Sequence, residues 1–303
     1  MIRDFEPIAP YDFKRTAACS RLYATTHAIT ETGLHRVFRV GDALALVRVT
    51  GTGGAAPRLR AECIAAQGRV DEDILAREVR RWLAVDVALT DFYQAAQGDA
   101  VLRRIVERLH GLHLLRTPSM FEALVVTMIE QQIALSAAQK AERWLVETYG
   151  ESITHDGGRY HAFPTAAVLA QLDEAALTPL KITFVRMRRI LALARAVCDG
   201  SLDLESLREG TPQYAHDVLL RISGVGHWTA AWTINRTLGV YRYIGSADVA
   251  LRAAVNHYWH GLPGRAGRAE TDAHFAAFGA YAGEACVYTL IALGLERYPQ
   301  ANA

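Results

Sequence analysis

The chain has 303 residues, of which 51% are hydrophobic and 21% charged, a composition typical of a globular protein with one large or two ordinary domains. It contains no apolar run near the roughly 18 residues that cross a bilayer, and its first residues do not resemble a secretory signal, so we expect a cytoplasmic protein without a membrane partner. The 33 Lys and Arg residues nearly balance 32 Asp and Glu residues, which argues against nucleic-acid binding through a broad basic surface and leaves local phosphate contacts.

The four cysteines are scattered and form no C-x-x-C pair. This spacing favours a reducing compartment and argues against a structural zinc or iron–sulfur site.

The first hundred residues have the alternating pattern of strands. Residues 35–40 and 43–49 flank Gly41-Asp42, a two-residue hairpin signal, and residues 59–65 suit a further strand. A helix is expected from Asp71. The pattern predicts a small antiparallel sheet with helices.

From about residue 100 the periodicity becomes helical. Ser119 with Glu122, and Ser136 with Gln139, have the spacing of capping boxes, which predicts helices over 120–132 and 137–149. Further helices are expected at 165–172, 185–198, 212–221, 229–238, 249–259 and 281–294. Nothing after residue 110 alternates like a sheet. We therefore predict a mixed α+β fold, with an N-terminal sheet domain over 1–105 and a larger all-α domain over 106–303.

The stretch "LRISGVGHWTAAW", residues 220–232, joins two of these helices. Thr211-Pro212 begins the first helix, and Trp228 or Thr229 opens the second. Gly224 and Gly226 allow positive φ angles and a close approach of the backbone to another surface. The second helix then presents free N–H groups, a natural phosphate site, although a compact helix–helix turn explains the same residues.

This stretch resembles the hairpin of the helix–hairpin–helix DNA glycosylase superfamily, which includes endonuclease III, with the pattern hydrophobic–x–G–hydrophobic–G–x–x–T–A. The resemblance implies that one DNA phosphate is bound by the hairpin residues Gly224, Val225, Gly226, His227 and Thr229. It also implies that a monovalent cation, Na⁺ or K⁺, can be held by the backbone carbonyls of Leu220, Ile222 and Val225.

Asp248 lies 24 residues after Gly224, where the superfamily has its essential aspartate. The resemblance implies that this carboxylate stabilises an oxocarbenium-like sugar and orients or deprotonates the attacking water. A simpler reading is that Asp248 caps a helix. Strand-cutting members of the superfamily carry a lysine where this chain has Trp228, so we expect no lyase activity. The four-cysteine iron–sulfur loop of endonuclease III is absent as well.

Trp228 and Trp232 are four residues apart and share one helix face, as core residues or as the walls of a base pocket. "GHWTAAW" resembles the "GRWTANY" of the bacterial 3-methyladenine DNA glycosylase II group, and "FEALVVTMIEQQIALSAAQKA" resembles another of its segments. Tyr281 matches a further stacking residue of that group. Aromatic faces attract the cationic purines that alkylation produces.

A glycosylase must evert the target nucleotide and fill the gap that it leaves. The resemblance places Gln132 and Ile133 at this duplex wedge, although Gln132 also suits a polar helix end. Arg186, Arg188 and Arg189 either reach phosphates or form a solvated helix face.

These features predict a monofunctional DNA glycosylase of base excision repair that acts on alkylated purines such as 3-methyladenine and 7-methylguanine. Its partner is double-stranded DNA containing such bases; we expect a bacterial monomer at the nucleoid that needs no cofactor for its chemistry. The alternatives are a glycosylase for neutral deaminated or oxidised bases, and a non-catalytic DNA-binding protein.

Overall fold

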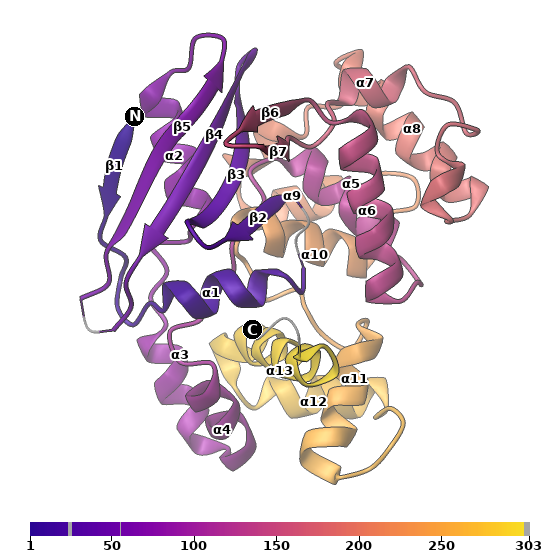
Figure 1. Cartoon of the computed structure of the whole chain (residues 1–303). Coiled ribbons are helices and arrows are strands. Elements are labelled where there is room, and N and C mark those ends of the chain that lie inside the picture. The colour runs from indigo at the N-terminus through magenta and orange to yellow at the C-terminus, as the bar shows by residue number, and fades with distance from the viewer. Residues whose placement is uncertain (24–25, 55, 300–303) are drawn as a thin grey trace.

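A five-stranded antiparallel sheet forms the first part of the protein (Figure 1). The computed structural model describes residues 1–23, 26–54 and 56–299. The strand order is β1-β5-β4-β3-β2. The strands are β1 (Ile2–Phe5), β2 (His27–Thr30), β3 (Gly33–Val40), β4 (Ala43–Gly51) and β5 (Leu59–Gln67). The predicted hairpin at Gly41-Asp42 joins β3 to β4, so the antiparallel sheet expected from the sequence is confirmed.

One face of this sheet packs against two helices, α1 (Phe13–Ser20) and α2 (Glu72–Trp82). Asp71 caps α2 by accepting hydrogen bonds from the backbone N–H groups of Asp73 and Ile74. Trp82 is 1% exposed, and its ring meets that of Phe38 on β3 edge-on, with 5.3 Å between ring centroids. These contacts seal the core beneath the sheet.

The opposite face of the sheet packs against a second, two-stranded hairpin, β6 (Ser152–His155) and β7 (Gly158–His161). The expectation of an all-α region after residue 105 was therefore wrong. Each strand has four residues and is largely polar, so neither shows the apolar alternation of a longer strand. Ile153 and Ala162 are nevertheless buried against residues of β3 and β4, and this burial holds the hairpin on the sheet.

A second core lies among helices in the middle of the chain. They are α5 (Met120–Glu130), α6 (Leu135–Tyr149), α7 (Ala166–Ala170), α8 (Phe184–Cys198), α9 (Pro212–Leu219) and α10 (His227–Leu238). Ser119 caps α5 as predicted, but Glu122 does not complete the capping box, because its carboxylate binds Arg36 and Thr26. The capping box at Ser136 was wrong, because α6 begins at Leu135 and Gln139 instead donates to the carbonyls of Arg21 and Leu22.

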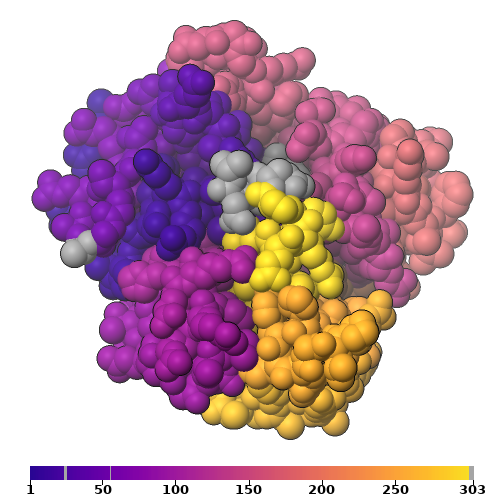
Figure 2. Space-filling model, turned by 60° about the horizontal axis from the view of Figure 1, so that its bottom comes forward, coloured from indigo at the N-terminus to yellow at the C-terminus, as the bar shows by residue number. Residues whose placement is uncertain are grey.

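A third core joins two segments that are far apart in the sequence. The helices α3 (Thr90–Ala95) and α4 (Ala100–Arg108) pack with α11 (Val249–Val255), α12 (Arg268–Ala276) and α13 (Ala282–Arg297). Figure 2 shows the α3–α4 segment directly against the C-terminal helices. The expected domain boundary after residue 105 falls within α4, and the division into domains stays a prediction. Among the helices that the structure describes, none has the length and apolar character of a membrane span.

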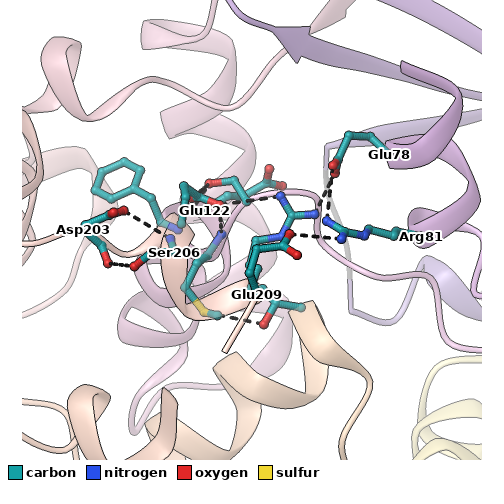
Figure 3. A network of polar contacts seen from close by, with 12 residues as sticks. Glu78, Arg81, Glu122, Asp203, Ser206 and Glu209 are labelled. Carbon is teal, nitrogen blue, oxygen red and sulfur yellow. Dashed lines mark hydrogen bonds and ion pairs between the residues drawn. The ribbon is translucent and has the colours of Figure 1, made fainter. Parts of the chain in front are cut away.

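Polar networks connect these cores. Glu205 accepts hydrogen bonds from the Ser119 hydroxyl and from the first backbone N–H groups of α5, while Arg208 pairs with Glu78 of α2 at 2.7 Å. Figure 3 shows Arg81 of α2 between Glu78 and Glu209, with which it forms ion pairs. A buried ion pair between Arg36 of β3 and Glu122 of α5, also at 2.7 Å, ties the sheet to the central helices. These contacts fix the start of α5 relative to the sheet.

Candidate active site

The glycine hairpin joins α9 to α10 through residues 220–226. Thr211 caps α9, as its sequence predicts. Gly224 has a φ of +84°, which favours glycine, whereas Gly226 has a φ of −95° and caps α10. The expectation of positive φ at both glycines was therefore wrong for Gly226. A Cβ atom at Gly226 would meet no heavy atom within 4 Å, so this backbone is open to the close approach of another molecule.

Arg189 of α8 lies over the hairpin. A Cβ atom at Gly224 would come within 2.4 Å of the Arg189 Cδ, so the glycine makes room for this side chain. Within the described residues, Arg189 has no hydrogen-bond or ion-pair partner. Arg186 instead donates to the carbonyl of Ile129 at 3.3 Å, and Arg188 is 3.7 Å from Glu174. Of the three arginines, only Arg189 is placed beside the hairpin with a free guanidinium.

Gln131, at the end of α5, connects the turn between α5 and α6 to the hairpin. Its side-chain amide donates to the Gly224 carbonyl at 3.0 Å and to the Thr229 hydroxyl at 2.8 Å. Thr229 is 2% exposed, so its side chain lies in the protein interior beneath the hairpin and not at the surface. Gln131 was not predicted as a site residue; its one signal in the sequence is its place beside Gln132 in the predicted turn.

The adjacent Gln132 is exposed and has a φ of +56°. Its side chain makes no hydrogen bond to any described residue, so it does not act as a helix-end cap. Ile133, by contrast, is half-buried and packs against the central core. Of the two predicted wedge residues, Gln132 is therefore the one that projects outward.

Asp248 caps α11 and is 8% exposed. Its Oδ1 accepts hydrogen bonds from the backbone N–H groups of Ala250 at 2.8 Å and Leu251 at 3.2 Å. Its Oδ2 accepts hydrogen bonds from the indole N–H groups of Trp228 at 2.8 Å and Trp232 at 3.0 Å. The capping function and the predicted grouping with the tryptophans are thus both present, and four donors stabilise the negative charge of this carboxylate.

The two tryptophans come from the first turns of α10, directly after the hairpin. Their ring centroids are 6.4 Å apart and their planes are tilted by 55°. Both rings are half-buried. Because Arg236, farther along α10, pairs with Glu130 of α5 at 2.6 Å, the helix carrying both rings is anchored to the central core.

Contacts on both sides fix the position of the cluster formed by Asp248, Trp228 and Trp232. Asp272 of α12 accepts hydrogen bonds from the backbone N–H and the hydroxyl of Ser246, two residues before Asp248. On the hairpin side, His227 bridges His216 at 3.2 Å and the Tyr243 carbonyl at 3.0 Å. Burial and the neighbouring His227 lower the pKa of His216, so the His216 ring is neutral at neutral pH.

Tyr281 lies apart from this cluster in its ring contacts. Its ring meets that of Phe92, with 6.3 Å between centroids, and it contacts neither tryptophan ring within the described residues. Tyr281 and Trp232 do pack against the same core of C-terminal helices. The structure therefore brings Asp248 together with Trp228 and Trp232 and leaves Tyr281 outside this cluster, against Phe92.

Of the three hairpin carbonyls expected to hold a monovalent cation, two accept no hydrogen bond from the residues described. The Ile222 carbonyl accepts a hydrogen bond from the Val225 N–H at 3.0 Å. The carbonyls of Leu220 and Val225 accept none from the residues described, so both are free to act as ligands. This donor set of neutral oxygens suits Na⁺ or K⁺.

No protein-family model matches the chain. A DNA-3-methyladenine glycosylase of Bacillus subtilis is 32% identical over 164 residues, which are 54% of this chain and 54% of that protein. DNA-3-methyladenine glycosylase 2 of Escherichia coli is 31% identical over 120 residues, 40% of this chain and 42% of that protein. The match thus spans about half the length of these curated relatives.

Solved structures show the same fold. A 3-methyladenine DNA glycosylase from Archaeoglobus fulgidus superposes with a TM-score of 0.77 at 18% identity, over 98% of this chain and 99% of that one. An 8-oxoguanine glycosylase/lyase of Clostridium acetobutylicum, bound to double-stranded DNA, gives a TM-score of 0.73 at 17% identity, over 99% and 98% of the two chains. The chain therefore has the fold of DNA glycosylases, as its hairpin motif predicts, and in sequence it is similar to those named for 3-methyladenine.

Proposed function

We propose that this protein is a monofunctional DNA glycosylase of base excision repair, which hydrolyses the N-glycosidic bond of alkylated purines in double-stranded DNA. The observation that carries this proposal is the cluster at Asp248. A nearly buried carboxylate accepts hydrogen bonds from four N–H groups, and two of these are the indoles of tryptophans in the first turns of α10, the helix that follows the exposed glycine hairpin. Relatives named DNA-3-methyladenine glycosylase support 3-methyladenine as a substrate, and we propose 7-methylguanine as a second cationic substrate of the same site.

The hairpin would position the DNA. The open backbone at Gly226 and the free N–H groups at the start of α10 suit one phosphate, and the Arg189 guanidinium adds a positive charge beside them. The carbonyls of Leu220, Ile222 and Val225 would hold a monovalent cation, which would supply further positive charge near that phosphate. Gln132, exposed on the neighbouring turn, would fill the gap left by the everted nucleotide.

Asp248 would act through its fixed negative charge. A carboxylate offers about four lone-pair directions, and four N–H groups already occupy them. This arrangement supports stabilisation of a cationic sugar and disfavours removal of a proton from water. The C1′–N bond breaks, its electron pair leaves with the alkylated purine, and water adds to C1′ and loses its proton to solvent.

Trp228 and Trp232 would bind the base. Their N–H edges face Asp248, and the Arg236 guanidinium lies over the Trp232 ring, 5.9 Å from its centroid, so a cationic purine would stack on the ring faces that these contacts leave. Trp228 also occupies the position at which strand-cutting relatives carry a lysine, and this supports release of the base without cleavage of the strand. We propose that the protein acts as a monomer on the DNA of the bacterial nucleoid.

Base release from methylated DNA tests this function. Incubation of the protein with alkylated duplex DNA should release 3-methyladenine and 7-methylguanine, identified by chromatography, and leave intact strands with abasic sites. The Asp248→Asn variant should bind abasic DNA and release no base, whereas Asp217→Asn, at an exposed position on α9, should retain full activity.

Other outcomes would identify the alternatives. Equal base release by Asp248→Asn would refute the catalytic assignment, and absence of release by the unaltered protein would indicate a DNA-binding protein without catalysis. Immediate strand cleavage, or a covalent adduct trapped by borohydride, would contradict the monofunctional mechanism. Release of hypoxanthine in place of methylpurines would assign the pocket to neutral bases.

A further inference from the structure

A cavity of about 440 Å³ lies between the sheet and helix α6, away from the site described above. Its walls come from the segment after α1, from β2 and β3, from the second half of α6 and from β7. Figure 1 shows the β6–β7 hairpin between the sheet and the central helices, and residues of β7 line the cavity. The cavity has no lining residue on the glycine hairpin, α10 or α11, and its volume is in the range of small-molecule sites.

The charge at this cavity is strongly positive, although the whole chain is almost neutral. The lining contains one carboxylate, that of Glu147, and four arginines, which are Arg21, Arg36, Arg143 of α6 and Arg159 of β7; Arg36 is paired with Glu122. Arg143 has no hydrogen-bond or ion-pair partner within the part of the chain that the structure describes. Arg159 uses only its Nε, which donates to the Ser152 hydroxyl at 2.9 Å, so its two terminal nitrogens are free. Two arginines with available donors suit a phosphate, which they bind with charge-assisted hydrogen bonds.

The inner wall of the cavity is aromatic and electrically neutral. The rings of Tyr160 and His35 stack with 5.3 Å between centroids and 29° between planes. Burial lowers the pKa of His35, and it lowers the pKa of His27 to about 3, so both imidazoles are neutral at pH 7. The positive charge therefore comes from the arginines, beside a flat ring surface. Guanidinium groups next to an aromatic platform are the combination that binds unpaired nucleotides.

His27 adds an unsatisfied acceptor to this wall. The Ser20 hydroxyl donates to the Ala17 carbonyl, so it accepts a hydrogen bond from the Nε2–H of His27 at 2.6 Å. The Nδ1 of His27 then carries a lone pair, and this buried atom has no partner among the described residues. Because buried polar atoms nearly always have a partner, a hydroxyl or amino group of a ligand, directly or through a water, would complete this one.

We propose that this cavity binds a nucleoside phosphate, with the phosphate on Arg143 and Arg159 and the base against Tyr160. The same chemistry is offered by a free mononucleotide and by an unpaired nucleotide at the end of a DNA strand. This site is separate from the base pocket at Asp248, and the proposal does not depend on glycosylase activity.

Calorimetric titration of the full chain tests the proposal. Deoxyadenosine monophosphate should bind, inorganic phosphate should bind more weakly, and deoxyadenosine should not bind measurably. The Arg143→Gln/Arg159→Gln variant should raise the Kd of the nucleotide by about tenfold or more, because it removes charged hydrogen-bond donors. Arg103→Gln, at an exposed position on α4, removes a charge elsewhere and should leave the Kd unchanged.

Further measurements assign the base contact and the source of the ligand. Tyr160→Leu should weaken binding of the nucleotide and leave binding of phosphate unchanged. A duplex with a 5′-phosphorylated single-stranded overhang that binds more tightly than the mononucleotide, and competes with it, would identify a strand end as the ligand; equal or weaker binding would identify a free nucleotide.

Three results would overturn the proposal: no binding of the nucleotide, an unchanged Kd in the double-arginine variant, or loss of binding in a Trp228→Phe variant. The last result would place the nucleotide in the base pocket.

Discussion

Replacing Asp248 by asparagine should destabilise the protein through a conflict between donors. The single amide oxygen of the new side chain can accept hydrogen bonds either from the Ala250 and Leu251 N–H groups or from the two indoles, but not from both pairs, because the other terminal atom is now an NH₂ group. In either orientation this NH₂ faces two N–H donors that the carboxylate holds at 2.8–3.2 Å. Loss of two hydrogen bonds to a charged, nearly buried acceptor should cost about 3 kcal/mol of unfolding free energy.

A double-mutant cycle measures this conflict. In a Trp228→Phe/Trp232→Phe background the indole donors are gone, so the amide oxygen introduced by Asp248→Asn can cap α11 while its NH₂ no longer faces a donor. The cost of Asp248→Asn should then fall to about 1 kcal/mol, which gives a coupling energy of about 2 kcal/mol. Denaturant unfolding of the four proteins provides the values. An equal cost of Asp248→Asn in both backgrounds would refute the idea that the indoles and the carboxylate act as one unit.

Three further predictions concern the hairpin and the sheet. Gly224→Ala should lower the unfolding free energy by about 1–2 kcal/mol, because the φ angle of Gly224 is +84°. Gly226→Ala should leave the unfolding free energy unchanged and weaken DNA binding, because its methyl group would occupy the open surface. Equal losses of unfolding free energy in denaturant titrations of the two variants would contradict this. Arg189→Gln should weaken binding of abasic duplex DNA and reduce the slope of log Kd against log salt by about one; fluorescence anisotropy at several salt concentrations would detect an unchanged slope. The pKa of His27 is lowered to about 3 in the folded protein, whereas the ordinary value of 6.5 applies when the chain is unfolded, so the unfolded state binds the proton first as the pH falls. Lowering the pH from 7 to 5 should therefore reduce the unfolding free energy of the unaltered protein by at most about 2 kcal/mol more than that of a His27→Gln variant. Identical pH dependence of the two proteins in denaturant titrations would count against a neutral buried ring.

The parts of the site that could be predicted from the sequence carry local signatures. Thr211-Pro212 marks the start of α9 because a capping hydroxyl and a proline need no distant partner. The spacing from Gly224 to Asp248 indicates the carboxylate because the superfamily motif fixes that distance along the chain. The spacing of Trp228 and Trp232 places them on one face of α10, and both indoles do reach the same carboxylate oxygen.

The parts that escaped prediction depend on contacts between distant residues. Gln131 is one of two adjacent glutamines in its own segment, and its partners Gly224 and Thr229 follow 93 and 98 residues later. The β6–β7 hairpin has four-residue strands that depend on burial of Ile153 against the sheet, so their own sequence does not favour strands. Ser136 has the spacing of a cap, but α6 begins one residue before it, because the tertiary contacts of Gln139 with the segment after α1 govern this turn.

The pairing of α3 and α4 with α13 has a consequence for synthesis on the ribosome. The hydroxyl groups of Tyr93 and Tyr288 lie 3.4 Å apart although 195 positions separate them in the chain, and the Tyr288 hydroxyl donates to the Leu112 carbonyl. While the nascent polypeptide is still growing, the apolar faces of α3 and α4 meet only the segment around Cys19 and Leu22, so this core closes only after α13 leaves the exit tunnel. Nascent chains that stop before α13 should therefore keep these faces exposed and be substrates for chaperones and proteases.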